Sequence, residues 1–153
     1  MNIDTIIIHC ADTPNGMKLT AKDIDDWHRQ RGWLRQPPIK INPQLTSIGY
    51  HFVILLDGTI ETGRSEDEIG AQALMYNDRS LGICLIGRDR FTDKQWYRLD
   101  NLVSDLFNKY NAPKVIGHRD VAPHKTCPGF DVTTWMVDKK PSPEHILEQP
   151  AIG

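Results

Sequence analysis

The stretch VIGHRDVAPHKTCPG, at residues 115–129, brings two histidines, a lysine and a cysteine into one short polar segment directly after an apolar run. We expect this segment to be a loop, because its prolines fix φ and prevent a helix from continuing. A neutral imidazole and a thiolate are good zinc ligands, so His118 and Cys127 are candidates for a metal site. His124 is an alternative to His118, since its spacing from Cys127 does not exclude it.

A third ligand is expected from the opposite end of the chain. Residues 3–10 are rich in isoleucine and predict a buried strand, with His9 near its end. Side chains alternate across a strand, so His9 can face a cleft while Cys10 packs in the core. Two histidines and one cysteine leave a fourth position for water, which is the pattern of a catalytic zinc site.

The composition indicates one ordinary globular domain in 153 residues. A formal net charge of −2 and a pI near 6.3 give no electrostatic case for binding nucleic acid or anionic lipid. No apolar run approaches the roughly 20 residues that span a bilayer, and the N-terminus shows no signal peptide. We therefore expect no membrane association, synthesis in the cytoplasm, and reduced thiols at the three cysteines.

Periodicity and turn signals predict an α/β fold with a mixed β-sheet flanked by helices. In the first helix, we expect Trp27 in the core and His28 in a partly exposed position. Further strands are expected at residues 49–56, 59–62, 81–86 and 114–116, and helices between Thr20 and Gly32, between Thr92 and Asn111, and from Asp131 to Val137.

Two segments lack periodicity. Leu34 to Ile48 contains three prolines and predicts an extended surface loop, either a functional rim or a tolerated insertion. The chain after Lys139 is also proline-containing, and we expect it to be a loosely attached tail. The predicted organisation is therefore a domain at residues 1–138 and a tail at residues 139–153.

Four motifs occur in an order that resembles a known family, the zinc-dependent N-acetylmuramoyl-L-alanine amidases of the phage-lysozyme type, which share a fold with peptidoglycan recognition proteins. The resemblance runs from about Ile6 to Trp135, and each motif alone is weak whereas the ordered set is specific. The motifs are IIIHCADT (6–13), GYHFVILLDGTIETGR (49–64), YNDRSLGICLIG (76–87) and GHRDVAPHKTCPGFD (117–131).

The resemblance implies a metal site and a catalytic pair. It makes His9, His118 and Cys127 the ligands of one Zn²⁺ per chain. It makes Tyr50 and Lys125 the catalytic side chains.

The resemblance also implies a substrate rim. It places Asn77 there, together with Gln72, which stands where many relatives carry a histidine and which can hydrogen-bond a sugar or peptide. His51 is a further candidate substrate contact, although its place opposite Tyr50 on the strand favours core or rim packing. We also expect Asp120 to fix the tautomer of a ligand histidine.

The function implied by the resemblance is hydrolysis of the amide bond between N-acetylmuramic acid and L-alanine in peptidoglycan, by a monomer. A phage endolysin that reaches the wall through a separate membrane pore fits these residues, and so does a cytosolic amidase that recycles muropeptides. Three alternatives remain open at this point. They are a non-catalytic peptidoglycan-binding module of the same fold, a cysteine hydrolase using Cys127 with His118 as base, and a structural zinc protein with His124 as fourth ligand.

Overall fold

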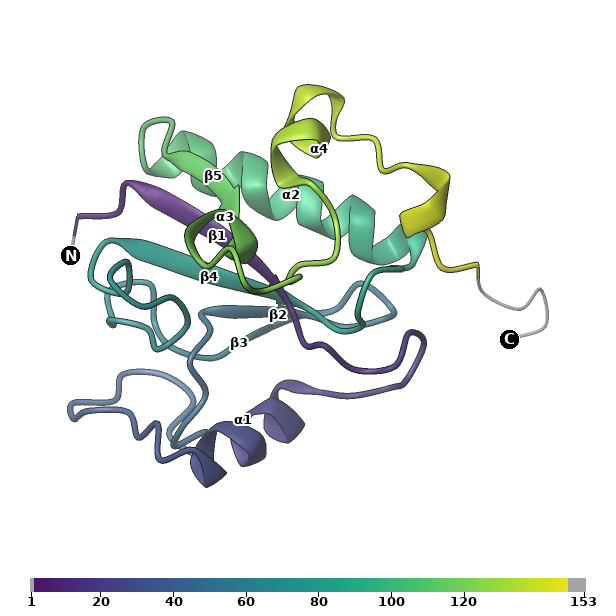
Figure 1. Ribbon diagram of the computed structural model, residues 1–153. Helices are drawn as coiled ribbons and strands as arrows, with labels where there is room; N and C mark the ends of the chain where they lie inside the picture. Colours follow the sequence, from purple (N-terminus) through teal and green to yellow (C-terminus); the bar gives the residue numbers. More distant parts are fainter. Residues whose placement is uncertain (1, 149–153) are drawn as a thin grey trace.

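A computed structural model describes residues 2–148 of the chain and confirms the α/β fold. A single mixed sheet has the strand order β3-β2-β4-β1-β5, and its neighbouring strands are parallel except in the antiparallel hairpin β2–β3 (Figure 1). The hairpin turns at Asp57-Gly58, as its sequence predicted, and its first strand is shorter than expected. The strands are β1 Thr5–Cys10, β2 Phe52–Ile54, β3 Ile60–Thr62, β4 Ser80–Leu85 and β5 Lys114–Gly117.

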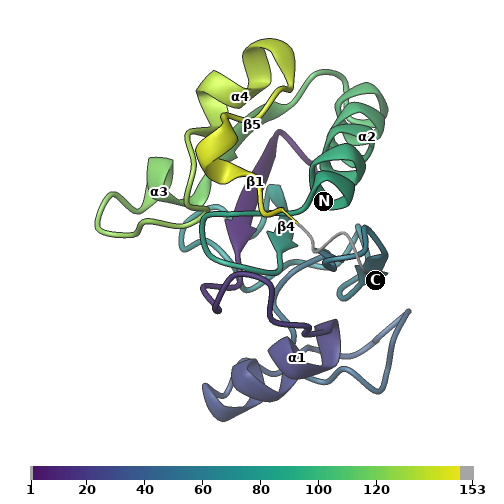
Figure 2. The same ribbon diagram turned by 90° about the vertical axis from the view of Figure 1, so that its right-hand side faces the viewer.

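The two longer helices pack on opposite faces of the sheet (Figures 1 and 2). Both begin with the capping boxes that their sequences contain, Thr20 with Asp23 and Thr92 with Gln95, so the predicted helix starts are confirmed. The helices are α1 Ala21–Gln30, α2 Asp93–Lys109, α3 His118–Val121 and α4 Val132–Asp138, followed by the 3₁₀ helix η1 Pro143–His145.

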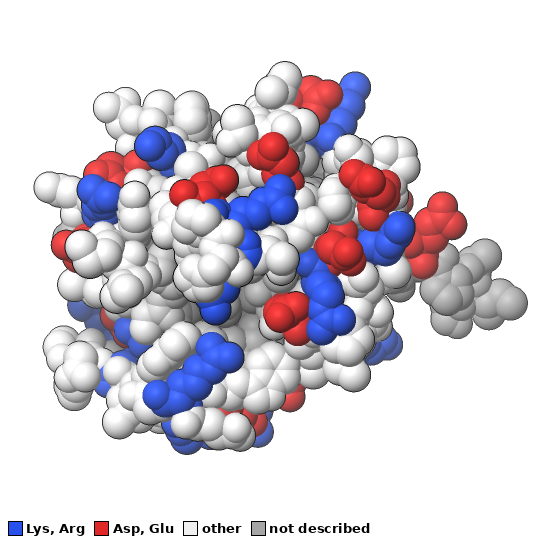
Figure 3. Space-filling model, viewed as in Figure 1, with Lys and Arg blue, Asp and Glu red and all other residues white. Residues whose placement is uncertain are grey.

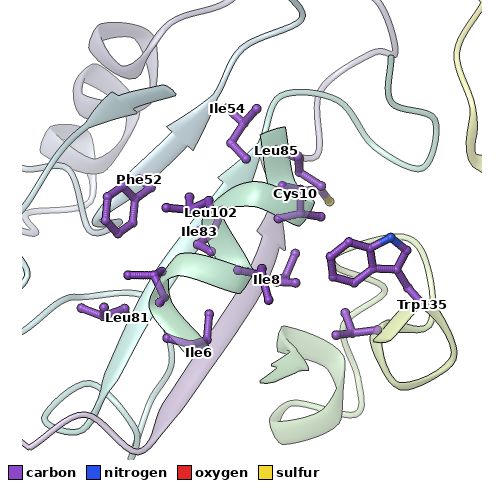
Figure 4. Close-up of a cluster of buried hydrophobic side chains, with 14 of the residues drawn as sticks. Ile6, Ile8, Cys10, Phe52, Ile54, Leu81, Ile83, Leu85, Leu102 and Trp135 are labelled. Atoms are coloured by element: carbon purple, nitrogen blue, oxygen red, sulfur yellow. The ribbon is translucent and has the colours of Figure 1, made fainter. Parts of the chain in front are cut away.

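The larger apolar core lies between the sheet and the helices α2 and α4. Alternate residues of β1, Ile6, Ile8 and Cys10, enter this core with side chains from β2, β4 and α2 (Figure 4). Every residue of β1 is buried, because the strand has parallel neighbours on both sides and helices cover both faces. The intervening residues of β1, including His9, therefore face the side of the sheet that α1 covers.

The segment of residues 118–121 is a short helix, so the prediction of a loop after the strand at 114–116 is wrong there. The carboxylate of Asp120 accepts a hydrogen bond from the Gly117 amide at 2.8 Å and caps the first turn. The amide of Ala122 then donates to the carbonyl of His118 at 3.0 Å. This local capping pattern outweighs the prolines, which lie outside the turn.

Residues 34–48 form no helix or strand, as predicted, but hydrogen bonds from a buried arginine order the segment. The buried guanidinium of Arg35 donates to both carboxylate oxygens of Glu68, at 2.9 and 2.7 Å. It also donates to the carbonyls of Ile41, Asn42 and Leu45 within the segment. A bidentate ion pair of this kind holds planar geometry, so it orders the loop, and both the functional rim and the tolerated insertion stay open.

The expectation of a loosely attached tail is wrong for the part that the structure describes. Phe91 pairs with the segment through two backbone hydrogen bonds, from its amide to His145 at 2.9 Å and from the Leu147 amide to its carbonyl at 2.8 Å. The indole of Trp96 also donates to the carbonyl of His145 at 3.0 Å. The rest of the predicted tail, residues 149–153, lies outside the described residues.

Deleting the chain after Lys140 should therefore destabilise the protein. The deletion removes four hydrogen bonds to residues 89–96. The three to Phe91 and Trp96 each contribute about 1 kcal/mol and the exposed one to Asp89 contributes less, so we expect a loss of about 3 kcal/mol. For a domain of this size, the melting temperature should fall by roughly 6–12 °C. A truncation after Glu148 is the control, because it keeps every residue that makes these hydrogen bonds. Equal melting temperatures for both truncations would show that the tail contributes no stability.

Candidate metal centre

The strand register brings His9 and His118 together. β1 and β5 are parallel with Ile8 beside Gly117, so the next residue of each chain segment emerges at the same end of the sheet. The two imidazole rings lie with their centroids 4.5 Å apart. Ligand atoms of His9, His118 and Cys127 all lie within 4.8 Å of one another. The three side chains predicted as ligands therefore converge.

Cys127 is held against the end of β1. Its sulfur accepts a hydrogen bond from the Cys10 amide at 3.1 Å, and its carbonyl accepts one from the Arg119 amide at 2.8 Å. An amide that points at the sulfur stabilises negative charge there, as a metal-bound thiolate requires. Contact with Cys10 and burial raise the pKa of the Cys127 thiol.

His124 does not join these side chains. It is exposed in the loop after α3, and the cluster of potential ligands in the described part of the chain contains His9, His118 and Cys127 alone. A structural site would need a fourth protein ligand, and the described residues offer none at this position. The geometry therefore disfavours both the alternative ligand and the structural zinc site.

The ring of His9 contacts Gln72 and not Asp120. The Nε2 atom of His9 lies 2.5 Å from the Gln72 side-chain oxygen. Asp120 caps α3 instead, so the expectation that it orients a ligand histidine is wrong. Gln72 is 7% exposed and faces His9, and its direct contact with substrate stays a prediction.

Tyr50 and Lys125 both lie near the histidines of the cluster. The ring of Tyr50 lies 4.9 Å from the His9 ring, and burial raises the pKa of its phenol well above the ordinary value. Lys125 is exposed, in the loop between His118 and Cys127. Burial and the nearby Lys125 charge lower the pKa of His118, which favours the neutral imidazole that a metal requires.

His51 is fully buried, so the prediction that it contacts substrate is wrong. Its Nδ1 atom accepts a hydrogen bond from the Gly82 amide at 3.0 Å, and its Nε2 atom donates to the Glu68 carbonyl at 2.7 Å. Both ring nitrogens are used within the protein. His51 thus joins β4 to the loop that carries Glu68.

Asn77 is half-buried at the edge of the site. Its side-chain oxygen accepts hydrogen bonds from the amides of Gln72 and Ala73, both at 2.9 Å. The side chain therefore shapes the loop that carries Gln72. A place on the substrate rim stays a prediction.

Sequence reasoning missed the role of His28. This side chain is buried, accepts a hydrogen bond from the Gly49 amide at 2.9 Å, and packs its ring against those of Tyr50 and Trp33. Trp27, expected in the core, is half-buried instead. The signal was present, because Ala21, Ile24 and His28 recur at the spacing of one helix face.

Charges of both signs are interspersed over the face shown in Figure 3. Within residues 2–148, none of the helices combines the length and the apolar character needed to cross a bilayer.

Comparisons with known proteins agree with this site. A family model described as N-acetylmuramoyl-L-alanine amidase matches residues 1–130. The endolysin of Escherichia phage T7 is 36% identical over 140 residues, which cover 86% of this chain and 84% of that endolysin. The solved N-acetylmuramoyl-L-alanine amidase LysC from Clostridium intestinale URNW has a TM-score of 0.71 at 35% identity, covering 85% of this chain and 78% of its own. Drosophila PGRP-LB has a TM-score of 0.71 at 31% identity, covering 96% and 86%.

This chain belongs to the N-acetylmuramoyl-L-alanine amidase family. The resemblance drawn from the four ordered motifs is confirmed, as are the fold shared with peptidoglycan recognition proteins and the amidase activity on the cell wall. In this family member, the cluster of His9, His118 and Cys127 is a group of side chains that could hold a metal ion.

The buried histidines of this amidase make the metal-free protein sensitive to acid. Burial lowers the pKa of His28 and of His51 from 6.5 to about 4. Between these values the unfolded chain binds protons that the native protein does not, so the free energy of unfolding should fall as the pH decreases from about 6.5 towards 4. Denaturant unfolding of the metal-free protein between about pH 7 and pH 4.5 measures this, and a constant free energy would contradict it.

Proposed function

We propose that this amidase binds one zinc ion through His9, His118 and Cys127 and hydrolyses the amide bond between N-acetylmuramic acid and L-alanine. The observation that carries the proposal is the convergence of these ligand atoms within 4.8 Å. Two imidazoles and a thiolate suit zinc better than harder cations, and three protein ligands leave a position for water. When bound there, zinc supplies a Lewis acid that polarises the scissile carbonyl and activates water near neutral pH.

Tyr50 is proposed to orient the attacking water. Its raised pKa keeps the phenol protonated at neutral pH, so it donates a hydrogen bond instead of removing a proton. Its ring lies 4.9 Å from the His9 ring, within the site and half-buried. Lys125 is proposed to stabilise the oxyanion that develops on the carbonyl oxygen, as a cation at the rim of the same cluster.

The proposed substrate is peptidoglycan or a soluble muropeptide. A Drosophila PGRP-LB variant, 31% identical to this chain, is described in complex with tracheal cytotoxin, which supports a ligand of this class. The endolysin relatives favour action on the intact wall, which a monomeric phage endolysin would reach through a separately made membrane pore. Recycling of soluble muropeptides is the second candidate. Mass analysis of the products from intact sacculi and from soluble muropeptides separates the two.

Substituting Cys127→Ser should abolish zinc binding and amidase activity together, because a hydroxyl is a poor zinc ligand in place of a thiolate. Elemental analysis of the purified variant measures the metal, and release of stem peptide from sacculi measures the activity. Ser104→Ala is the control, since Ser104 lies on α2, which covers the opposite face of the sheet. Full activity of Cys127→Ser, or of chelator-treated protein, would refute the proposal.

Tyr50→Phe and Lys125→Ala should keep stoichiometric zinc and turn over slowly. Removing one group that stabilises the transition state typically lowers kcat by about 10²–10³-fold. Exposed Lys140→Ala, in the segment before η1, is the control for loss of a surface charge. Unchanged kcat in either site variant would remove that residue from the mechanism, and loss of zinc would assign it a structural role.

A further inference from the structure

A series of hydrogen bonds connects Tyr76 to His9 through the side chains of Ser80 and Gln72. The hydroxyl of Ser80 donates to the Tyr76 carbonyl at 2.7 Å. The side-chain nitrogen of Gln72 donates to that hydroxyl oxygen at 2.7 Å. The side-chain oxygen of Gln72 is then left facing Nε2 of His9, at 2.5 Å.

This series of hydrogen bonds determines where the protons lie. The Ser80 hydroxyl donates its only proton to the Tyr76 carbonyl. In its contact with Gln72, the hydroxyl oxygen can therefore only accept a hydrogen bond. The amide group of Gln72 must therefore present its NH₂ to Ser80 and its oxygen to His9. An oxygen without a proton accepts only, so the Nε2 atom of His9 carries the hydrogen and its Nδ1 atom has the lone pair.

The surroundings of Gln72 are shaped to hold it in this place. A Cβ at Gly82 would lie 2.8–2.9 Å from the Gln72 side chain, so only glycine leaves room for it over β4. The side-chain oxygen of Asn77 accepts a hydrogen bond from the backbone amide of Gln72 at 2.9 Å. Gln72 itself is 7% exposed, within a network in which each of its side-chain polar atoms has a partner.

We propose that Gln72 is a positioning residue for zinc. It fixes His9 in the Nε2–H tautomer and orients the ring, so that Nδ1 is presented to the ion beside His118 and Cys127. Ser80 acts through Gln72, because it prevents the amide from turning its NH₂ group towards His9. The inference rests on the proposed zinc site and adds residues that do not touch the ion.

Zinc affinity of purified variants tests the proposal without any measurement of activity. Gln72→Leu removes the acceptor at similar volume, and the zinc dissociation constant should rise about 10–100-fold, as for the loss of other groups that orient metal ligands. Ser80→Ala should give a smaller rise, because Gln72 remains but can turn. Both constants can be measured by competition with a chromophoric chelator.

Gln95→Leu is the matched control. Gln95 is also a buried glutamine, and its side chain donates to the carbonyls of Ile54 and Ile86 at 3.1 and 2.9 Å, on the other face of the sheet. This variant should lose stability comparably and keep the zinc affinity of the unsubstituted protein. An equal loss of affinity in Gln95→Leu and Gln72→Leu would mean that the effect is general destabilisation, and would overturn the proposal.

Nitrogen-15 NMR of the zinc-loaded, unsubstituted protein gives a second readout that needs no variant. The His9 ring should show a protonated Nε2 and a metal-bound Nδ1. Binding through Nε2, or an unchanged dissociation constant in Gln72→Leu, would overturn the role of Gln72 while the zinc amidase proposal stands. Absence of zinc binding by the unsubstituted protein would instead overturn both.

Discussion

Parallel pairing of β1 with β5 is the constraint on which the site depends. The pairing places Ile8 beside Gly117, so the two histidines that follow these residues emerge next to each other although they are separated by most of the chain. β1 can lie between β4 and β5 because its isoleucines tolerate burial on both faces of the sheet. A slip of one residue would turn His9 into the apolar core and separate it from His118.

The two faces of the sheet bury different kinds of side chain. The face covered by α2 and α4 buries an almost wholly apolar cluster, which supplies the hydrophobic stabilisation of the domain. The face covered by α1 buries polar groups, including His9, Asp25 and His28, each of which has a hydrogen-bond partner. A buried polar group without a hydrogen-bond partner would destabilise the protein by about 1–3 kcal/mol. The polar side chains of the site can therefore be buried on this face only because each has a hydrogen-bond partner.

The rim of the site is fixed in the same way. Asp25 accepts hydrogen bonds from the amides of Ser47 and Ile48, just before Tyr50, and Arg35 ties the preceding loop to Glu68. These contacts order a segment that has no regular secondary structure. A catalytic side chain at the end of such a segment can therefore be held as firmly as one on a strand.

The sequence by itself determined the elements, the family and the candidate ligands. Isoleucine-rich β1, the capping residues of α1 and α2, and the Asp57-Gly58 turn are local signals, and local signals can be interpreted from neighbouring residues alone. The ordered motifs likewise lie within the sequence. Only the tertiary structure decided that Gln72 faces His9, that His51 and His28 are buried, and that the tail pairs with Phe91. Each of these contacts joins residues that are distant in the chain, and their partners are set by sheet register and packing, which no local pattern encodes.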